Sequence, residues 1–349
     1  MSELFDVTII GGGPAGLYST FYSGLRNMKT KLIESQAQLG GKVLLYPEKM
    51  IWDAGGQPPI LAHKFAEQLI NQAKTFHPTI LTNTKVDFIE KDSNNVFVIT
   101  TNDGSKHYSK SIIMANGGGI INPQKLEIEG AEKYEMANLH YTVQSLKQFH
   151  NKRVLVSGGG NGAIDWAVEL LDIAEEIIVA YRKDQLSAHE AQVVRLQESK
   201  KVTFLLNTTI ERLIANKEKT KVKQVVLKKH DTDQTLLHGI DHIIVSHGYN
   251  RDASLEFANN SALKLKDNYY YEGTATGKTS QEGIFAAGDI LSYEGKVNLL
   301  VGAFQDAVNA VNSAKTYIEP TADKIGMVSS HNEKFQEKNR QLIKQMLVQ

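Results

Sequence analysis

Two glycine-rich segments are the residues of this chain best suited to chemistry, and both have the form of a phosphate-binding loop. The first reads Gly11-Gly-Gly13-Pro-Ala-Gly16, and the second reads Gly158-Gly-Gly160-Asn-Gly-Ala163. Glycine allows a tight turn and a close approach of the backbone to pyrophosphate, while a following helix presents free N–H groups and its positive dipole end. The pattern G-x-G-x-x-G/A is typical of dinucleotide sites. The chain is therefore predicted to bind two dinucleotides.

The residues that would meet the ribose differ between the two sites. Glu34 lies 18 residues past Gly16, where a carboxylate accepts hydrogen bonds from ribose hydroxyls. The second copy has Tyr181-Arg182-Lys183 at the corresponding strand end and no carboxylate. An arginine there pairs with a 2′-phosphate, which an acid would repel. The second site is thus predicted to take NADPH in preference to NADH, with His189 as a further phosphate ligand. The competing interpretation of Arg182 and Lys183 is a solvated charge pair.

A third motif distinguishes the first site from the second. The segment Gly283-Ile-Phe-Ala-Ala-Gly-Asp289 reads as a short apolar strand that ends in Gly-Asp. Combined with the first glycine motif, it fits the second fingerprint of FAD proteins, with Gly288 close to the flavin chain and Asp289 bonded to its ribityl or phosphate region. This favours FAD over NAD at the first site. Because the motif follows the second glycine segment, the second copy is predicted to be inserted into the first.

The elements that must position these motifs repeat one βαβ design. Strands are predicted at 6–10, 31–34, 153–157 and 176–181, and helices at 15–27, 58–77, 163–174 and in the tail from 333 to 349. The first glycines of the two motifs lie 147 residues apart. We therefore expect an α/β fold of two Rossmann-like three-layer dinucleotide-binding domains, the second inserted into the first. The FAD-binding domain is expected at 1–118 and 249–349, with a C-terminal tail, and the NADPH-binding domain at 119–248.

Composition narrows the class of protein further. The 349 residues are 41% hydrophobic and 22% charged, enough for two globular cores. Lys+Arg and Asp+Glu number 39 each, so we expect no nucleic-acid partner and no membrane association. The absence of cysteine excludes disulfides, a thiolate nucleophile and a cysteine-bound metal, and no metal site is expected. The acidic start of the chain and the short apolar run 7–10 predict a cytoplasmic protein.

With these motifs, the chain resembles the thioredoxin-reductase-like bacterial ferredoxin/flavodoxin–NADP⁺ reductases (type 2) over essentially its whole length. The resemblance rests on Ile9–Gly16, Leu39–Gly41, Tyr46–Lys49, Asn138–Tyr141, Ser157–Gly160, Tyr181–Arg182, Ala188–Glu190, Phe285–Ile290 and Tyr293–Asn298. It implies a homodimer that transfers electrons between NADPH and ferredoxin or flavodoxin, by hydride transfer to the flavin and then single-electron steps. It implies that the flavin itself carries out the reaction and that no side chain is catalytic.

The resemblance also implies roles for individual residues. Tyr46 would stack on one flavin face, Val328 would lie at the other, where relatives often have His or an aromatic residue, and Ser330 would bond the flavin chain and ring. Lys42 and Ile121 stand where the family usually has Gln and Phe. With the motif residues, the FAD set comprises Gly11, Gly13, Pro14, Ala15, Gly16, Glu34, Lys42, Tyr46, Val86, Ile121, Asp289 and Ser330. The NADPH set comprises Gly158, Gly160, Asn161, Ala163, Arg182, Lys183 and His189.

The absence of cysteine bears on the rival functions. A thioredoxin reductase needs a C-x-x-C just before the second glycine motif, where this chain reads His140-Tyr-Thr-Val-Gln144. A flavin monooxygenase or an NAD(P)H oxidase stays open as another NAD(P)H-dependent flavin oxidoreductase. A non-catalytic FAD-binding regulator would need a broken second site, and this one is intact in sequence. Steady-state NADPH oxidation with an added electron acceptor separates the enzyme from the regulator.

Overall fold

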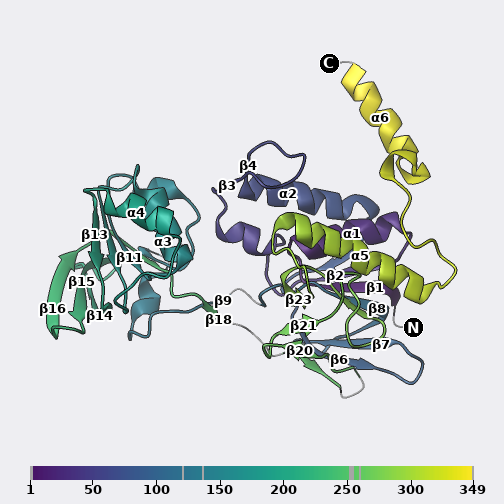
Figure 1. The fold of residues 1–349 in the computed structure, drawn as a ribbon, viewed down its shortest axis with the longest axis horizontal. Helices are drawn as coiled ribbons and strands as arrows, with labels where there is room; N and C mark the ends of the chain where they lie inside the picture. Colours follow the sequence, from purple (N-terminus) through teal and green to yellow (C-terminus); the bar gives the residue numbers. More distant parts are fainter. Residues whose placement is uncertain (1–2, 120–121, 136, 251–254, 259–260, 348–349) are drawn as a thin grey trace. The chain divides into compact units, whose positions relative to one another are not determined.

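A computed structural model of the protein describes residues 3–119, 122–135, 137–250, 255–258 and 261–347 (Figure 1). The chain forms two compact units. The first unit contains residues 1–44, 50–120 and 252–349, and the second contains residues 45–49 and 121–251. The short segment Leu45–Lys49 thus groups with the second unit, which the sequence did not predict.

The first unit is built on a mixed sheet of eight strands in the order β19-β6-β7-β8-β1-β2-β5, with β22 pairing β8. The parallel strands include β1 (Leu4–Ile10), β2 (Thr30–Ile33), β5 (Thr79–Leu81) and β22 (Ile284–Ala286), with β8 (Lys106–Met114) between β1 and β22. β6 (Val86–Lys91) and β7 (Phe97–Thr101) are antiparallel, and β19 (Glu256–Phe257) is an edge strand. Helices α1 (Pro14–Leu25) and α5 (Leu300–Ile318) pack together beside α2 (Ala62–Ala73) (Figure 1).

β-branched residues explain the central strands. Val7 and Ile9 on β1 are fully buried, as are Leu32 on β2 and Ile112 on β8. A parallel strand covered on both faces has no solvent-facing side, and all four residues of Val7–Ile10 are accordingly buried, Thr8 with its apolar neighbours. One hydrophobic core lies between this sheet and the three helices, and a second lies on the opposite face.

The second unit holds a parallel five-stranded sheet in the order β10-β17-β11-β12-β13. Its strands are β10 (Leu139–His140), β17 (His242–Val245), β11 (Arg153–Ser157), β12 (Glu176–Ala180) and β13 (Val202–Leu205). Helices α3 (Asn161–Leu170) and α4 (Glu190–Gln197) follow β11 and β12. An antiparallel sheet of β14 (Thr208–Ala215), β15 (Val222–Lys229) and β16 (Gln234–Gly239) supplies another layer, whose Val225 and Leu227 share a core with Leu155 and Ile178.

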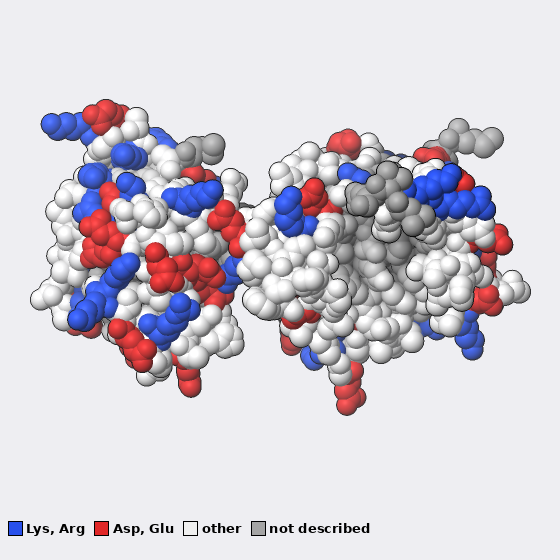
Figure 2. All heavy atoms as spheres, turned by 90° about the horizontal axis from the view of Figure 1, so that it is seen from above, with Lys and Arg blue, Asp and Glu red and all other residues white. Residues whose placement is uncertain are grey.

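Short elements complete the two units. They are β3 (Met50–Ile51), β4 (Ile60–Leu61), β9 (Asn122–Pro123), β18 (Tyr249–Asn250), β20 (Leu265–Lys266), β21 (Tyr270–Glu272), β23 (Leu291–Ser292) and the C-terminal helix α6 (Gln336–Leu347). On the face shown in Figure 2, basic and acidic side chains are interspersed on each unit, in keeping with the zero net charge.

Two histidines meet inside the second unit. His140 Nε2 and His242 Nδ1 lie 3.0 Å apart, and Phe149 packs edge-on against both rings. Burial lowers the pKa of His140 to about 4, and the neighbouring His242 adds to this shift. Burial also lowers the pKa of His242. Both imidazoles are therefore neutral in the folded protein at neutral pH.

Acid is expected to weaken this unit before its carboxylates titrate. An unfolded histidine has a pKa of about 6.5, so the unfolded state binds more protons than the folded state between that value and the folded pKa of about 4. Stability is fully present above pH 6.5 and falls as the pH drops through this window, with a loss of about 2 kcal/mol reached at pH 5. Urea unfolding at pH 7 and pH 5 should show the loss, and His140→Leu should reduce it. An equal loss in that variant would contradict this explanation.

Candidate functional site

The first glycine motif forms the turn between β1 and α1. Gly11 has a φ of +109°, and a side chain on it would overlap the Ala115 carbonyl oxygen. A side chain on Gly16 would overlap the Gly11 carbonyl oxygen. Gly13 is the N-cap of α1, with Pro14 following, and neither a side-chain cap nor an acidic residue occupies the first turn. The N–H groups of that turn are therefore free for a phosphate, as a pyrophosphate cradle requires.

Glu34 lies directly after β2 and points back to this turn. Its Oε2 accepts a hydrogen bond of 2.6 Å from the Gly12 N–H, and its Oε1 accepts one of 2.7 Å from the Gln36 N–H. Ser35 Oγ also donates to Oε1, at 3.1 Å, so Oε2 is the oxygen that keeps a second lone pair to which a ribose hydroxyl can donate. The carboxylate predicted to bind ribose is thus buried beside the glycine loop, where that role requires it.

The Gly288-Asp289 turn reaches the same place from the far end of the sequence. Gly288 has a φ of +76°, and a Cβ on it would lie 2.8 Å from the Ala15 Cβ in the first turn of α1. Asp289 forms an ion pair of 3.0 Å with Lys42, and both side chains are about half exposed. The structure therefore brings together four parts of the predicted FAD set, namely the loop Gly11–Gly16, Glu34, Lys42 and Asp289.

These residues fit the dinucleotide that they are predicted to bind. A Cβ on Gly13 would meet only the Gly41 Cα, at 3.8 Å, which leaves room beside the free N–H groups. Asn116, whose Cα lies next to Gly11, has a buried side-chain oxygen with no hydrogen-bond partner among the described residues. A buried acceptor of this kind needs a donor, and a cofactor with hydroxyl or amide groups can supply one. Sequence reasoning missed Asn116, because its position beside Gly11 depends on strand pairing.

The structure does not add the other predicted FAD residues to this cluster. Val86 is buried in the core on the opposite face of the first unit's sheet. Tyr46 belongs to the second unit, where its ring lies 5.0 Å from that of Trp166 and burial raises its pKa to about 12. Ile121 lies outside the described residues. The roles of these three residues stay predictions.

Val328 and Ser330 lie in a tail held at the C-terminal end of α1. Arg26 Nη2 donates to the Asp323 carbonyl at 2.5 Å, and the Gly326 N–H donates to Tyr22 Oη at 3.2 Å. Val328 is 60% exposed. Since α1 begins at Pro14, about 12 Å of helix separates Tyr22, and about 18 Å separates Arg26, from the glycine loop at its other end.

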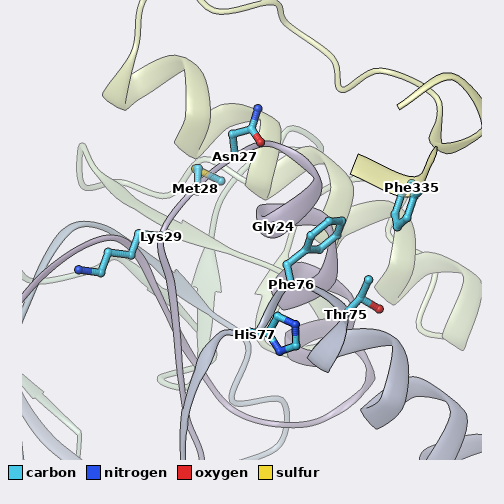
Figure 3. Close-up of a pocket in the computed structure, with 8 residues that line it drawn as sticks. All are labelled: Gly24, Asn27, Met28, Lys29, Thr75, Phe76, His77 and Phe335. Carbon is cyan, nitrogen blue, oxygen red and sulfur yellow. The ribbon is translucent and has the colours of Figure 1, made fainter. Parts of the chain in front are cut away.

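A surface pocket marks the same end of α1. It has a volume of about 480 Å³, and Gly24, Phe76, His77 and Phe335 are among its lining residues (Figure 3). The Phe335 ring of the tail lies 5.5 Å from the Phe76 ring. None of the residues predicted to bind a dinucleotide lines this pocket, so it is a third attachment point of the tail and not part of the dinucleotide site.

The second glycine motif has the same construction in the second unit. Gly158 has a φ of +145°, and a side chain on it would overlap the Ser246 carbonyl oxygen. Ala163 is buried against the core. Gly160 is the N-cap of α3, again without a side-chain cap or an acidic first turn, and no atom lies within 4 Å of a Cβ built on it. The loop therefore leaves open space in front of free N–H groups.

The segment between β12 and α4 returns to this loop. The Ser187 N–H donates to the Gly159 carbonyl at 2.8 Å, and the His189 N–H donates to Asn161 Oδ1 at 3.0 Å. This segment carries three exposed side chains that were predicted to bind phosphate, namely Arg182, Lys183 and His189. The predicted phosphate ligands thus start and end a segment that is tied to the N-terminus of α3.

His247 is a neighbour of this site that sequence reasoning missed. Its Nε2 lies 2.9 Å from Ser157 Oγ at the end of β11. Burial lowers the pKa of His247, and the positive charge of Arg182 lowers it further. The signal in the sequence was its place directly after β17, because the carboxyl ends of parallel strands meet at one edge of the sheet.

The described part of the chain offers neither a metal site nor a membrane-spanning helix. Among those residues, no group of three or more His, Asp or Glu side chains is placed to hold a metal ion. No helix there is both long and apolar enough to cross a bilayer.

Two Rossmann-like units with a dinucleotide cradle in each define a class of two-nucleotide oxidoreductases. The chain belongs to the pyridine nucleotide-disulphide oxidoreductase family, whose model matches residues 5–314. It is 64% identical over 348 residues to ferredoxin–NADP reductase 3 of Lysinibacillus sphaericus, covering 100% of this chain and 99% of that protein. It is 57% identical over 347 residues to ferredoxin–NADP reductase 2 of Exiguobacterium sibiricum, covering 99% and 98%. The resemblance predicted from the motifs is confirmed.

Solved structures agree on the fold. Thioredoxin reductase from Lactococcus lactis superposes with a TM-score of 0.72 at 25% identity, covering 90% of this chain and 99% of that one. The thioredoxin reductase of T. acidophilum gives 0.71 at 22% identity, covering 90% and 98%. The predicted α/β architecture of two dinucleotide-binding domains is thus confirmed.

Proposed function

We propose that this protein is a ferredoxin/flavodoxin–NADP⁺ reductase, which transfers electrons between NADPH and a small electron-transfer protein through FAD. The observation that carries the proposal is 64% identity to a ferredoxin–NADP reductase over the full length of both chains. Two intact glycine cradles support it, because an electron relay between two cofactors needs both sites. The expected domains, FAD at 1–118 with 249–349 and NADPH at 119–248, are part of the proposal.

The side chains and backbone of the protein would bind FAD and NADPH and hold them in position. In the first unit, the α1 N-terminus and Gly11–Gly16 would hold a pyrophosphate, Glu34 the ribose, and Asp289 the flavin chain. In the second unit, Gly158–Ala163 would hold the NADPH pyrophosphate, and Arg182 with Lys183 and His189 the 2′-phosphate. FAD, when bound, supplies the chemistry that accepts a hydride and releases electrons singly.

The acceptor decides between this function and its rivals. The test is NADPH-dependent cytochrome c reduction in the presence of ferredoxin or flavodoxin, with thioredoxin and a thiol-reactive dye in parallel. We expect turnover with ferredoxin or flavodoxin and none with thioredoxin, because a chain without cysteine has no thiol relay. Rapid NADPH oxidation by oxygen alone would instead support the oxidase alternative, and efficient thioredoxin reduction would refute the assignment.

The proposal also includes a homodimer. It further includes a cytoplasmic location, where NADPH serves as a soluble reductant. The homodimer is supported by the position of the tail. The tail is anchored at the end of α1 opposite to the glycine loop. Val328 and Ser330 would therefore contact the flavin of a second copy and not their own.

The tail proposal predicts a spectral effect that depends on dimerisation. Light scattering should give about twice the chain mass of 38.7 kDa. Val328→Phe should then shift the flavin absorption bands, since an aromatic ring stacks on the flavin where valine cannot. The exposed Ile325, replaced in the same way, is the control and should leave the bands unchanged. A monomer whose spectrum responds to Val328→Phe would contradict contact across a dimer.

A further inference from the structure

The backbone N–H and the carbonyl oxygen of Gly288 both bind side chains from outside its own turn. Its N–H donates to Asp306 Oδ2 at 3.1 Å, and its carbonyl accepts from Lys296 Nζ at 2.9 Å. Asp306 comes from α5, and Lys296 comes from the segment between β23 and α5. The Leu291 N–H of the turn also donates to this carbonyl. The two side-chain contacts therefore fix the peptide planes on both sides of the Gly288 Cα, a restraint beyond the hydrogen bonds of the turn's own backbone.

The two side chains form a buried ion pair. Lys296 Nζ contacts Asp306 Oδ2, and their side chains are 9% and 0% exposed. Tyr293 Oη donates to Asp306 Oδ1 at 2.7 Å. Burial and this carboxylate raise the pKa of Tyr293 to about 12, so its hydroxyl stays a donor at neutral pH. Each oxygen of the buried carboxylate thus has a partner.

Such a pair is poorly explained by stability alone. Desolvating two charges costs several kcal/mol, and apolar side chains of similar volume often serve as well or better. What apolar residues cannot do is hold both an N–H and a carbonyl in a defined orientation. The arrangement therefore indicates a requirement for position at Gly288.

The position that is held belongs to the first dinucleotide site. Gly288 lies against Ala15 at the opening turn of α1, and the next residue, Asp289, pairs with Lys42. We propose that Lys296, Asp306 and Tyr293 are positioning residues that fix Asp289 for FAD, a role that rests on the proposed function of this unit. They act through the backbone N–H and carbonyl of Gly288, and we call the three side chains the Gly288 clamp.

The test is a double-mutant cycle on FAD affinity, measured by fluorescence titration of the full-length apoprotein. Lys296→Met should raise the FAD Kd about 30-fold, and Tyr293→Phe about 3-fold, since the first removes a buried charge partner and the second one hydrogen bond. In an Asp289→Ala background, Lys296→Met should add less than about 3-fold, because the residue that the clamp positions is gone. The matched control is Lys315→Met. It removes a buried lysine that pairs at 2.7 Å with Glu319 on α5, and it should leave the FAD Kd unchanged.

The possible results separate the Gly288 clamp from the proposed function of the protein. Additive effects of Lys296→Met and Asp289→Ala, or an unchanged FAD Kd in Lys296→Met, would overturn the clamp. If Lys296→Met lowers the melting temperature of the apoprotein more than Lys315→Met does, the cycle is decided with Tyr293→Phe instead, which keeps the ion pair. A wild-type chain that binds no FAD would refute the proposed function itself, whereas wild-type binding with additive mutations refutes only the clamp.

Discussion

Replacing Gly160 with valine is expected to abolish productive NADPH binding while leaving the fold intact. Gly160 has a φ of −89°, which any residue can adopt, and no atom lies within 4 Å of a Cβ at this position. The protein alone therefore does not require glycine there. A pyrophosphate lying against the N-terminus of α3 does, so the NADPH Kd should rise by about 100-fold or more. Titration of NADPH, with FAD content and melting temperature measured in parallel, checks this.

Gly158→Val is the matched comparison, because its defect should lie in the fold. The φ of +145° and the overlap with the Ser246 carbonyl both oppose a side chain. Strain of this kind costs roughly 1–3 kcal/mol or more, so the melting temperature should fall clearly. If Gly160→Val were the less stable of the two, or bound NADPH as well as the wild type, the second cradle would be wrongly assigned.

Arg182→Ala is expected to erase the preference for NADPH. A charge-assisted contact to the 2′-phosphate contributes about 1.5–3 kcal/mol, so the KM for NADPH should rise roughly 10- to 100-fold. The KM for NADH should change little, because NADH lacks that phosphate. Steady-state kinetics with both nucleotides measures the difference.

Arg212 provides the control for this substitution, since it is an exposed arginine on β14 of the same unit. Arg212→Ala removes the same charge and should leave both KM values near those of the wild type. A wild-type preference for NADH, or an equal rise for both nucleotides in Arg182→Ala, would rule out Arg182 as the 2′-phosphate ligand.

Local signals in the sequence were sufficient for the elements around each glycine motif. A strand at 6–10 and a helix at 15–27 were predicted, and the structure has β1 at Leu4–Ile10 and α1 at Pro14–Leu25. A helix predicted over 58–77 is shorter. It begins at Ala62, after β4. A residue before a proline is disfavoured in the helical region, which applies to Gln57 and Pro58. Ile60 and Leu61 then pair with β3. The helix gives way to a 3₁₀ turn that ends at His77, whose φ is +52°.

Long-range features could not be predicted in this way. Lys296 and Asp306 are ten residues apart in a segment with no motif of its own, and their joint contact with Gly288 exists only after α5 packs on α1. Nothing in the sequence of Leu45–Lys49 indicates that this segment belongs to the second unit, where the Tyr46 ring lies 5.0 Å from that of Trp166. The pattern in the tail predicts a helix, and α6 is found at Gln336–Leu347, but the pattern cannot say where the chain attaches.

The insertion of one unit into the other sets the order in which the chain can fold during synthesis. All strands of the second unit's sheets lie between residues 122 and 250, so that unit is complete once the ribosome has made residue 251. The first unit must wait for β22 and α5, which pair with β8 and pack on α1 from the last fifth of the chain. Until then the Ile112–Met114 end of β8 lacks its partner β22 and α1 has an uncovered apolar face, the kind of surface on which nascent chains aggregate. The nascent chain therefore depends most on chaperones while residues 252–318 are being made.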